Sequence, residues 1–245
     1  MNPHAHRYAL YFAPPEPWRT LGDQWLGRSP ETGAAVPAAP GADPRQAGWT
    51  TDPRRYGLHA TLKPPFRLRP GTTPRGLDAA VRALAARTQV FDAPMQCREL
   101  RGFLAWCLAD DAQALARMQA LGADAVQSLD DWRAPPTETE LARRRRASLS
   151  PHHEAMLARW GYPYVFDQFV FHITLSDKLH GQDLEDAKRR IEAMSAPLLR
   201  EPMPVESVSL YVQPEPDAPF LVARHYGFEG GTVDCAGAVY LESAA

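Results

Sequence analysis

The sequence predicts an α+β fold of two similar lobes, in which antiparallel sheets face a central cleft and helices lie on the outside. Two observations predict this class. Short apolar runs of strand length alternate with segments of helical periodicity along most of the 245 residues. The order of these segments also repeats, because in each half a strand that carries one histidine is followed by a helix and then by strands. A duplicated α+β lobe is the simplest architecture with that rhythm.

The expected elements begin with an aromatic, apolar strand at residues 7–14, which two prolines end. Residues 17–28 suit a short helix. Residues 29–53 are rich in Pro, Gly and Ala without periodicity, so we expect a long surface loop there. The apolar run at 56–62 predicts the first histidine strand, which a second pair of prolines is expected to end.

The remaining elements follow from the same two periodicities. Helices are expected where apolar residues recur every three or four positions, and strands where short apolar runs lie between turn residues. In order, these are helix 73–91, one or two strands in 95–109, helix 111–129, a helix over 137–160 with an interruption near 150, the second histidine strand at 169–175, helix 183–199, and strands 205–214 and 219–229. Residues 230–245 are either an added edge strand or a loose tail. The whole chain, 1–245, is expected to be one bilobal domain with interleaved lobes.

The composition is that of an ordinary globular protein. The chain is 44% hydrophobic and 23% charged with a formal net charge of −2, so neither disorder nor a strong attraction to nucleic acid is expected. No apolar stretch approaches the roughly 18 residues that span a bilayer, and the first residues lack the pattern of a secretory signal. The three cysteines are few and far apart, which favours a reducing compartment. We therefore expect a cytoplasmic protein without membrane contact.

Two short motifs carry the functional prediction. "YGLHATL" occupies 56–62 and "FVFHITL" occupies 169–175, and each places His-x-Thr-Leu in an apolar strand. A His-x-Thr triplet alone is close to chance, but two copies with leucine in matching places have a chance of about one in a thousand. Residues i and i+2 of a strand share a face, so His59 projects beside Thr61, and His172 beside Thr174.

If the two lobes pack about a pseudo-twofold axis, the histidine–threonine pairs face each other across a cleft. One imidazole could then remove a proton from an attacking water while the other protonates the departing oxygen of a phosphodiester. The threonine hydroxyls could donate hydrogen bonds to the non-bridging phosphoryl oxygens. Histidine suits both roles because its ordinary pKa lies near neutrality, at about 6.5.

This pattern resembles the 2H phosphoesterase superfamily, which is defined by two His-x-[Ser/Thr] strand motifs in similar lobes. More narrowly, "RYALYFAP", "DPRRYGLHATLKPPFRL", "ELARRRRASLSPHHEAMLARWGYPYV" and "FVFHITLS" resemble a bacterial branch often encoded with phosphonate-degradation genes, over roughly residues 7–228. The superfamily resemblance implies a bilobal fold, catalysis without metal or cofactor, and catalytic roles for His59, Thr61, His172 and Thr174. The branch resemblance implies a small cyclic phosphate substrate. The expected function is therefore hydrolysis of a ribose cyclic phosphate or a cyclic nucleotide by a cyclic phosphodiesterase.

Three further residues are expected to contact the substrate. Lys63 shares a strand face with Thr61 and could add positive charge, although a solvated lysine is an equal alternative. Tyr11 could line the cleft as a platform, although a core aromatic is favoured. Arg133 and the run Arg143 to Arg146 are the strongest local basic features. A solvated helix face is the default for the run, and the alternative is that one or two of its arginines hold a terminal phosphate.

Two other functions stay open at this stage. The same cleft could bind RNA ends or nucleotides without catalysis, although the acidic balance counts against a large RNA footprint. The histidines could instead be metal ligands, but neither motif contains Asp, Glu or Cys, so we expect no metal site.

Overall fold

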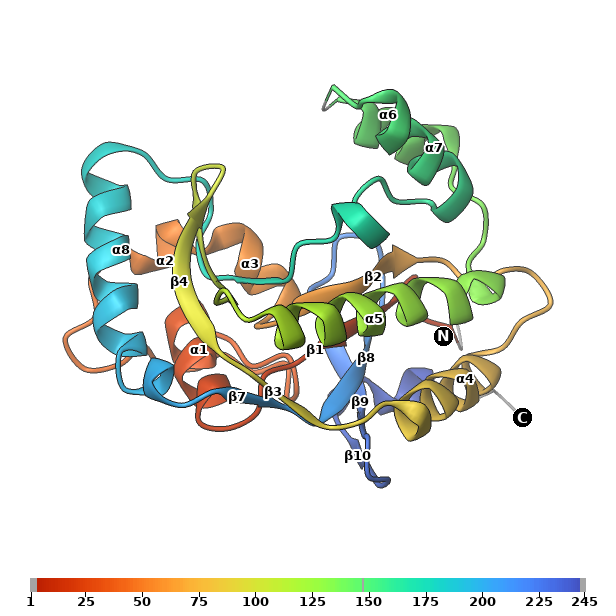
Figure 1. Cartoon of the computed structure of the whole chain (residues 1–245), viewed down its shortest axis with the longest axis horizontal. Helices are drawn as coiled ribbons and strands as arrows, with labels where there is room; N and C mark the ends of the chain where they lie inside the picture. The colour runs from red at the N-terminus through yellow and green to blue at the C-terminus, as the bar shows by residue number, and fades with distance from the viewer. Residues whose placement is uncertain (1–3, 147, 243–245) are drawn as a thin grey trace.

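An eight-stranded antiparallel sheet forms the centre of the molecule. The computed structural model describes residues 4–146 and 148–242. Within them the strand order is β10-β9-β8-β1-β2-β6-β5-β4, and helices flank the sheet (Figure 1). A separate two-stranded ladder joins β3 and β7. The predicted α+β class is confirmed.

The strands of the large sheet are short, and several come from distant parts of the chain. They are β1 (Arg7–Phe12), β2 (Ala60–Phe66), β4 (Met95–Leu100), β5 (Phe103–Leu108), β6 (His172–Thr174), β8 (Ser207–Gln213), β9 (Leu221–Gly227) and β10 (Thr232–Asp234). The small ladder is β3 (Phe91–Ala93) and β7 (Met203–Val205). The helices are α1 (Trp18–Leu26), α2 (Gln46–Trp49), α3 (Thr51–Tyr56), α4 (Pro74–Arg87), α5 (Ala112–Ser128), α6 (Glu138–Arg145), α7 (Pro151–Trp160) and α8 (Gly181–Ser195).

The sheet joins the ends of the chain to its middle. Strands from the first 66 residues and from residues after 206 (β10, β9, β8, β1 and β2) make one side, and strands from the middle (β6, β5 and β4) make the other. The boundary between these groups is the pair β2–β6, and these are the two strands at which the histidine motifs lie. The topology therefore brings two motifs half a chain apart into direct contact.

Local sequence signals explain the long helices. Helix α4 begins where the Thr73 hydroxyl accepts a hydrogen bond from the Gly76 amide, with Pro74 in the first turn. Its buried residues include Leu77, Val81 and Leu84, which recur at the helical period. In β1, Tyr8, Leu10 and Phe12 pack into the main core, while Ala9 and Tyr11 pack on the other face in a smaller cluster.

The first histidine strand starts and ends later than expected. The expected loop at 29–53 contains α2 and the start of α3, which runs to Tyr56, so β2 begins only at Ala60. The strand then continues through Pro64 and Pro65, which we expected to end it. Proline lacks an amide hydrogen, but β6 is too short to pair with this part of β2, and the β1 pairing is irregular there.

The expected helix at 137–160 is divided into α6 and α7, as its interruption near 150 predicted. Thr137 and Glu140 form a capping box at the start of α6. Ser150 caps the start of α7, and its hydroxyl accepts a hydrogen bond from the His153 amide. The two helices stand at the top of the molecule above β2 and α5 (Figure 1). In the C-terminal segment, β10 adds an edge strand on β9.

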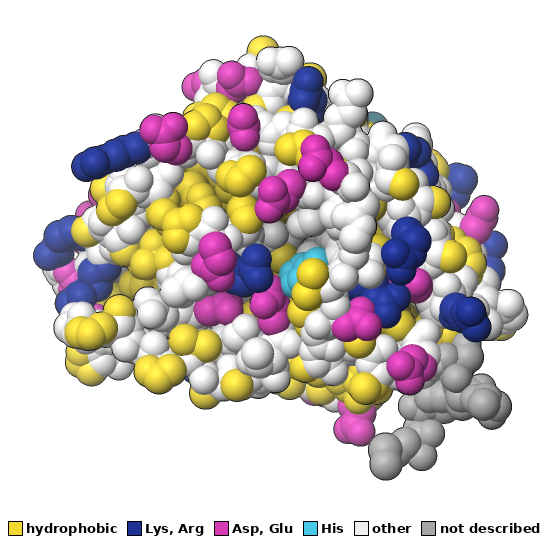
Figure 2. Space-filling model, turned by 90° about the horizontal axis from the view of Figure 1, so that it is seen from below, with side chains coloured by type: hydrophobic (Ala, Val, Ile, Leu, Met, Phe, Trp, Pro, Cys, Tyr) yellow, Lys and Arg dark blue, Asp and Glu magenta, His cyan; other side chains and the backbone are white. Residues whose placement is uncertain are grey.

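The surface in Figure 2 carries side chains of every kind. Hydrophobic side chains gather on the left half of this face, and acidic and basic side chains are interspersed around them. The face that Figure 2 shows therefore has no broad patch of one charge. Among the described residues, no helix has both the length and the apolar character that crossing a membrane requires.

Candidate active site

The two motif strands are neighbours in the sheet rather than opposing walls of two sheets. β2 and β6 pair antiparallel through Ala60 and Ile173, the middle residues of the two His-x-Thr motifs. Both middle side chains are buried in the core. The flanking histidine and threonine side chains of each motif therefore point to the opposite face of the sheet.

The register sets the four motif side chains in a rectangle. Because the pairing is antiparallel and centred between the motifs, His59 lies across from Thr174, and Thr61 lies across from His172. Directly opposite residues in such a pair have Cβ atoms about 5 Å apart, and diagonal neighbours lie about 7–8 Å apart. The histidines occupy one diagonal and the threonines the other. The structure thus brings together all four motif residues that the sequence singled out.

Each imidazole is anchored by one nitrogen to the backbone two residues before it. His59 Nδ1 lies 2.8 Å from the Gly57 carbonyl oxygen, and His172 Nδ1 lies 2.7 Å from that of Val170. A carbonyl oxygen can only accept, so Nδ1 carries the hydrogen in both rings. In the neutral form, Nε2 of each ring is then free to accept a proton.

Burial keeps both imidazoles neutral at physiological pH. Burial lowers the pKa of His59 to about 4, against the raising effect of the Gly57 hydrogen bond, and the nearby His172 lowers it further. Burial also lowers the pKa of His172, with a smaller contribution in the same direction from the Arg101 charge. Both rings are therefore bases in the free protein, and an anionic ligand beside them would favour the protonated form.

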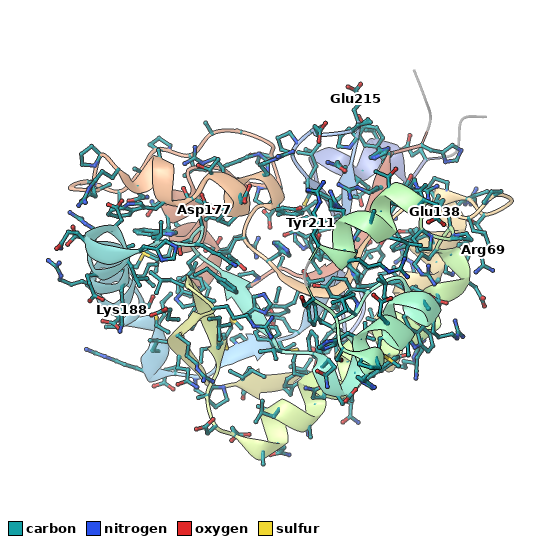
Figure 3. All side chains as sticks on the ribbon, turned by 90° about the horizontal axis from the view of Figure 1, so that it is seen from above. Arg69, Glu138, Asp177, Lys188, Tyr211 and Glu215 are labelled. Carbon is teal, nitrogen blue, oxygen red and sulfur yellow. The ribbon has the colours of Figure 1, made fainter. Side chains whose placement is uncertain are left out.

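Tyr11 supports His59 from behind. Its ring stacks on the His59 ring with centroids 4.0 Å apart and an interplanar angle of 27°. Tyr11 is only 1% exposed, and it also packs on Tyr211, whose hydroxyl donates to the Leu58 carbonyl oxygen at 3.1 Å. Figure 3 shows Tyr211 in the interior of the molecule. Tyr11 is therefore a core residue that orients the imidazole, and not the exposed platform that we had expected as one alternative.

A cavity of about 380 Å³ opens beside the motifs, and we call it the histidine cavity. Thr61 and His172 line it together with aromatic side chains that include Phe103, Tyr162 and Tyr164. The Phe103 ring lies 5.6 Å from the His172 ring, centroid to centroid. The cavity is thus apolar on several sides and polar at the motif residues, which is the usual composition of a small-molecule site.

Arg101 brings a positive charge to the same cavity. It lies in the turn between β4 and β5, where its φ of 53° is followed by Gly102 at 91°. Its guanidinium lies 5.7 Å from the centroid of the Tyr164 ring. Sequence reasoning missed Arg101, Tyr162 and Tyr164. The "GYPY" run just before the second motif was the available signal for the two tyrosines, and no signal distinguished Arg101 from other turn arginines.

Lys63 does not line the histidine cavity. It does not share the strand face of Thr61, because the register of β2 against β1 shifts between the two residues: Lys63 pairs with Leu10 on the main-core side, and Thr61 pairs with Tyr11 on the other. Lys63 is 1% exposed and packs against α5. Its Nζ donates to the Val126 carbonyl oxygen at 2.8 Å, in the last turn of α5, and lies 3.5 Å from Asp130 Oδ1. Burial lowers its pKa to about 8, although the Asp130 charge acts in the opposite direction. Lys63 therefore binds a carbonyl oxygen at the C-terminal end of α5 and does not contact a substrate.

Arg133 belongs to the same buried network. Its Nε lies 2.9 Å from Asp130 Oδ1, and Arg159 Nη1 lies 3.0 Å from Asp130 Oδ2. Burial raises the pKa of Asp130, but hydrogen bonds and charges from Arg133 and Lys63 outweigh it and lower the pKa overall. The expectation that Lys63 contacts the substrate is thus corrected, because Lys63 is buried against α5 and Asp130. The expectation for Arg133, which the same carboxylate engages, stays a prediction.

The residues after the second motif fix the segment before the first. Asp177 Oδ2 accepts from the Thr51 amide at 3.0 Å and Oδ1 from the Asp52 amide at 2.9 Å, at the start of α3. Its own amide donates to the Trp49 carbonyl oxygen. Ser176 Oγ accepts from the Leu104 amide on β5 at 2.9 Å. Asp177 therefore holds α3 against the second motif and, through α3, sets the position of the first (Figure 3).

One cluster of metal-ligand types lies elsewhere in the described part of the chain. Potential ligand atoms of Glu31, His225 and Cys235 all lie within 4.8 Å of one another. The His225 ring nitrogens already contact Ser209 Oγ at 2.7 Å and Glu31 Oε1 at 2.9 Å, and Arg19 pairs with the same Glu31 oxygen at 2.6 Å. These groups satisfy one another without an ion, so we assign no metal to them.

Fold and site together define an antiparallel α+β protein with a paired two-histidine site. The chain belongs to the family described as "Protein of unknown function (DUF1045)", whose model matches residues 61–221. The match begins at Thr61, within the first motif, and contains the whole of the second.

Two curated bacterial proteins are similar over nearly the whole chain, and both are named "Ribose 1,5-bisphosphate phosphokinase PhnN". The protein of Janthinobacterium sp. (strain Marseille) is 37% identical over 235 residues, which is 91% of this chain and 51% of the relative. The protein of Laribacter hongkongensis (strain HLHK9) is 33% identical over 220 residues, 89% of this chain and 51% of the relative. The chain therefore spans about half the length of these relatives.

These names correct the expected function. We expected a cyclic phosphodiesterase, or as an alternative a non-catalytic RNA-end or nucleotide-binding protein. Both relatives are named as phosphokinases, enzymes that transfer a phosphoryl group, and not as phosphodiesterases. The expected link to phosphonate-associated proteins is supported by the same relatives and by the family.

Proposed function

We propose that this chain is an enzyme of phosphonate metabolism that binds a small phosphorylated ribose in the histidine cavity and takes part in phosphoryl transfer there. The observation that carries the proposal is the antiparallel pairing of the two motifs, which sets two anchored imidazoles and two hydroxyls on one face. The relatives' printed name supports the sugar and the type of group transferred.

The proposed roles follow from the donors and acceptors. Phosphoryl transfer to or from a sugar hydroxyl requires that the hydroxyl proton be removed or returned. A neutral imidazole with a free Nε2 can accept that proton, and the second imidazole, once protonated beside the anion, can donate one. Thr61 and Thr174 have hydroxyls that can donate to the non-bridging oxygens, and Arg101 can hold the negative charge.

The test is direct conversion of phosphorylated ribose, followed by phosphorus NMR. Ribose 5-phosphate and ribose 1,5-bisphosphate are incubated with the chain, with and without ATP and Mg²⁺. Both conditions are needed because the relatives are named as kinases, whereas the 245 residues contain no G-x-x-x-x-G-K-[Ser/Thr] phosphate loop. We expect turnover of one of them, and a loss of at least about 10²-fold in His59→Ala and in His172→Ala.

The matched control is His4→Ala, which removes an exposed histidine far from both motifs in the sequence. It should leave the rate unchanged. The proposal would be overturned if the chain neither bound nor converted either sugar phosphate, with or without ATP and Mg²⁺. Full activity in both motif variants would overturn it as well.

Two narrower expectations stay proposals of the same kind. We propose that the chain shares the two-motif architecture of the 2H superfamily, which the pairing of β2 with β6 supports. We also propose a cytoplasmic location, which is supported by the three cysteines, all of which are free.

A further inference from the structure

A second, smaller cavity lies beside the histidine cavity, and five of its thirteen lining residues are arginines. Its volume is about 40 Å³, which is room for a few water-sized groups. We call it the arginine cavity. Its charged lining residues are Arg7, Arg67, Arg133, Arg143, Arg144 and Glu140.

The positive charges in this cavity exceed the negative ones. Glu140 is the one acidic lining residue, and it pairs with Arg67 at 3.2 Å. Arg133 is engaged by Asp130. Within residues 4–146 and 148–242, no carboxylate lies within 4.0 Å of the remaining three guanidinium groups, which belong to Arg7, Arg143 and Arg144. These like charges come from separate segments, β1 and α6, and the fold holds them at one point.

The two cavities share a wall. On β2, Pro64 lines the histidine cavity and the next residue, Pro65, lines the arginine cavity. After α7, Gly161 lines the arginine cavity and the next residue, Tyr162, lines the histidine cavity. The Arg144 guanidinium lies 4.7 Å from the centroid of the Tyr162 ring. Adjacent residues of two segments therefore line the two cavities.

Strand β1 connects the arginine cavity with the surroundings of His59. Arg7 and Tyr11 lie on the same face of β1, four residues and about 13 Å apart along the strand. Tyr11 stacks on His59, and the Arg7 guanidinium lies 5.7 Å from the centroid of the Phe220 ring, which Tyr11 also contacts.

We propose that the arginine cavity is an anion subsite for a second phosphoryl group, so that the ligand of this site is a bisphosphorylated sugar. The inference rests on the proposed function for the first phosphoryl group, at the histidines. Guanidinium groups present several N–H donors in a planar fork that matches phosphoryl oxygens, and they stay charged when partly buried. A dianion also offsets the repulsion between the crowded arginines, since no carboxylate among the described residues lies within 4.0 Å of the Arg7, Arg143 or Arg144 guanidinium group.

The first test measures binding of inorganic phosphate by calorimetry in a His59→Ala, His172→Ala, Arg101→Gln background, which removes both imidazoles and the guanidinium group from the histidine cavity. The variant is Arg143→Gln, Arg144→Gln, on a helix without buried residues, so folding is not at risk. The matched control is Arg145→Gln, Arg146→Gln at the end of the same helix, which removes the same charge from residues outside the cavity lining. We expect the dissociation constant to rise about tenfold or more in the cavity variant and less than about twofold in the control.

The second test compares ribose 1,5-bisphosphate with ribose 5-phosphate on the chain with intact histidines. The preference for the bisphosphate should disappear in the cavity variant and persist in the control. Loss of phosphate binding equally in both arginine pairs would overturn the subsite, since that result reports general charge. Equal affinity of wild type and cavity variant would overturn it as well. Phosphate binding in the first test, together with no sugar phosphate binding in the second, would leave the subsite standing and overturn the proposed function.

Discussion

Ala60 of β2 and Ile173 of β6 face each other across the middle of the sheet, 1% and 0% exposed. This one pair fixes the site, because a shift of the register by one residue would send the motif side chains into the core. Two lobes facing across a cleft are not needed to bring the histidines together. Adjacent strands place them on a diagonal, at about 7–8 Å, with a threonine beside each.

The protonation of His59 gives a prediction that needs no substrate. Its Cε1 proton resonance should titrate with a midpoint near 4, since burial disfavours the imidazolium. Added inorganic phosphate should move the midpoint upward by about one unit or more, because a nearby anion favours the charged ring. A His59→Gln spectrum assigns the resonance. A midpoint near 6.5, or one that phosphate does not move, contradicts the described environment.

The same shift affects stability in a defined direction. Between pH 6.5 and 4 the unfolded chain binds a proton at residue 59 that the folded chain does not, so stability is lost as the pH falls through this range. His59→Gln should therefore lose less stability than wild type between pH 7 and 4.5 in urea unfolding. An identical loss in both proteins would show that His59 is not the group responsible.

The sequence was informative wherever periodicity and caps act locally. Helix α4 follows from its Thr-Pro start and its apolar spacing, α5 from its Asp111 cap and apolar spacing, and α8 from its apolar spacing alone. The interruption between α6 and α7 follows from Ser150 and Pro151. The sequence also singled out the four residues that β2 and β6 bring together, because both strands carry the same rare string in matching contexts, and their catalytic role stays a prediction.

Features set by tertiary contact were not predictable. Strand alternation wrongly put Lys63 on the face of Thr61, because a register shift in the pairing of β2 with β1 turns Lys63 to the main-core side, where it contacts α5. Arg101 enters the site because β5 pairs with β6, a contact between segments about 65 residues apart. Local patterns carry no information on either contact.

Lys63 should therefore behave as a structural residue. Lys63→Ala removes the cation that pairs with Asp130 and the donor to the end of α5, and we expect a loss of about 3 kcal/mol in the free energy of unfolding. Phosphate affinity of the folded protein should change less than about twofold. The measurements are urea unfolding and calorimetry, with the exposed Lys188→Ala as the control. A large loss of phosphate affinity with an unchanged free energy of unfolding would contradict this role and show that Lys63 binds the ligand.

Asp177 should contribute to stability through α3. Asp177→Ala leaves the amides of Thr51 and Asp52 without their carboxylate acceptor, at a cost of about 1–2 kcal/mol. Thermal unfolding checks this, with the exposed Asp110→Ala as the control. Hydrogen exchange should also rise in residues 51–57. An unchanged melting temperature with unchanged exchange would show that α3 does not depend on this cap.

Asp23 gives the clearest dependence of stability on pH. It is 6% exposed in α1, and its Oδ1 has no hydrogen-bond partner among the described residues. Burial raises its pKa to about 7, against a lowering hydrogen bond from Ser29. Between about 3.8 and 7 the folded chain holds a proton that the unfolded chain has released, so stability is lost as the pH rises through this range.

Replacing this carboxyl by its neutral isostere removes the effect. Asp23→Asn should raise the free energy of unfolding at pH 8.5 by up to about 4 kcal/mol and change it little at pH 4. Urea unfolding at several pH values measures both, and Asp110→Asn, an exposed carboxyl, is the matched control. The gain must grow with pH and level off above 7, since that is where the buried carboxyl is fully ionised. A gain of the same size at pH 4 and 8.5 would point to packing rather than to the charge of Asp23.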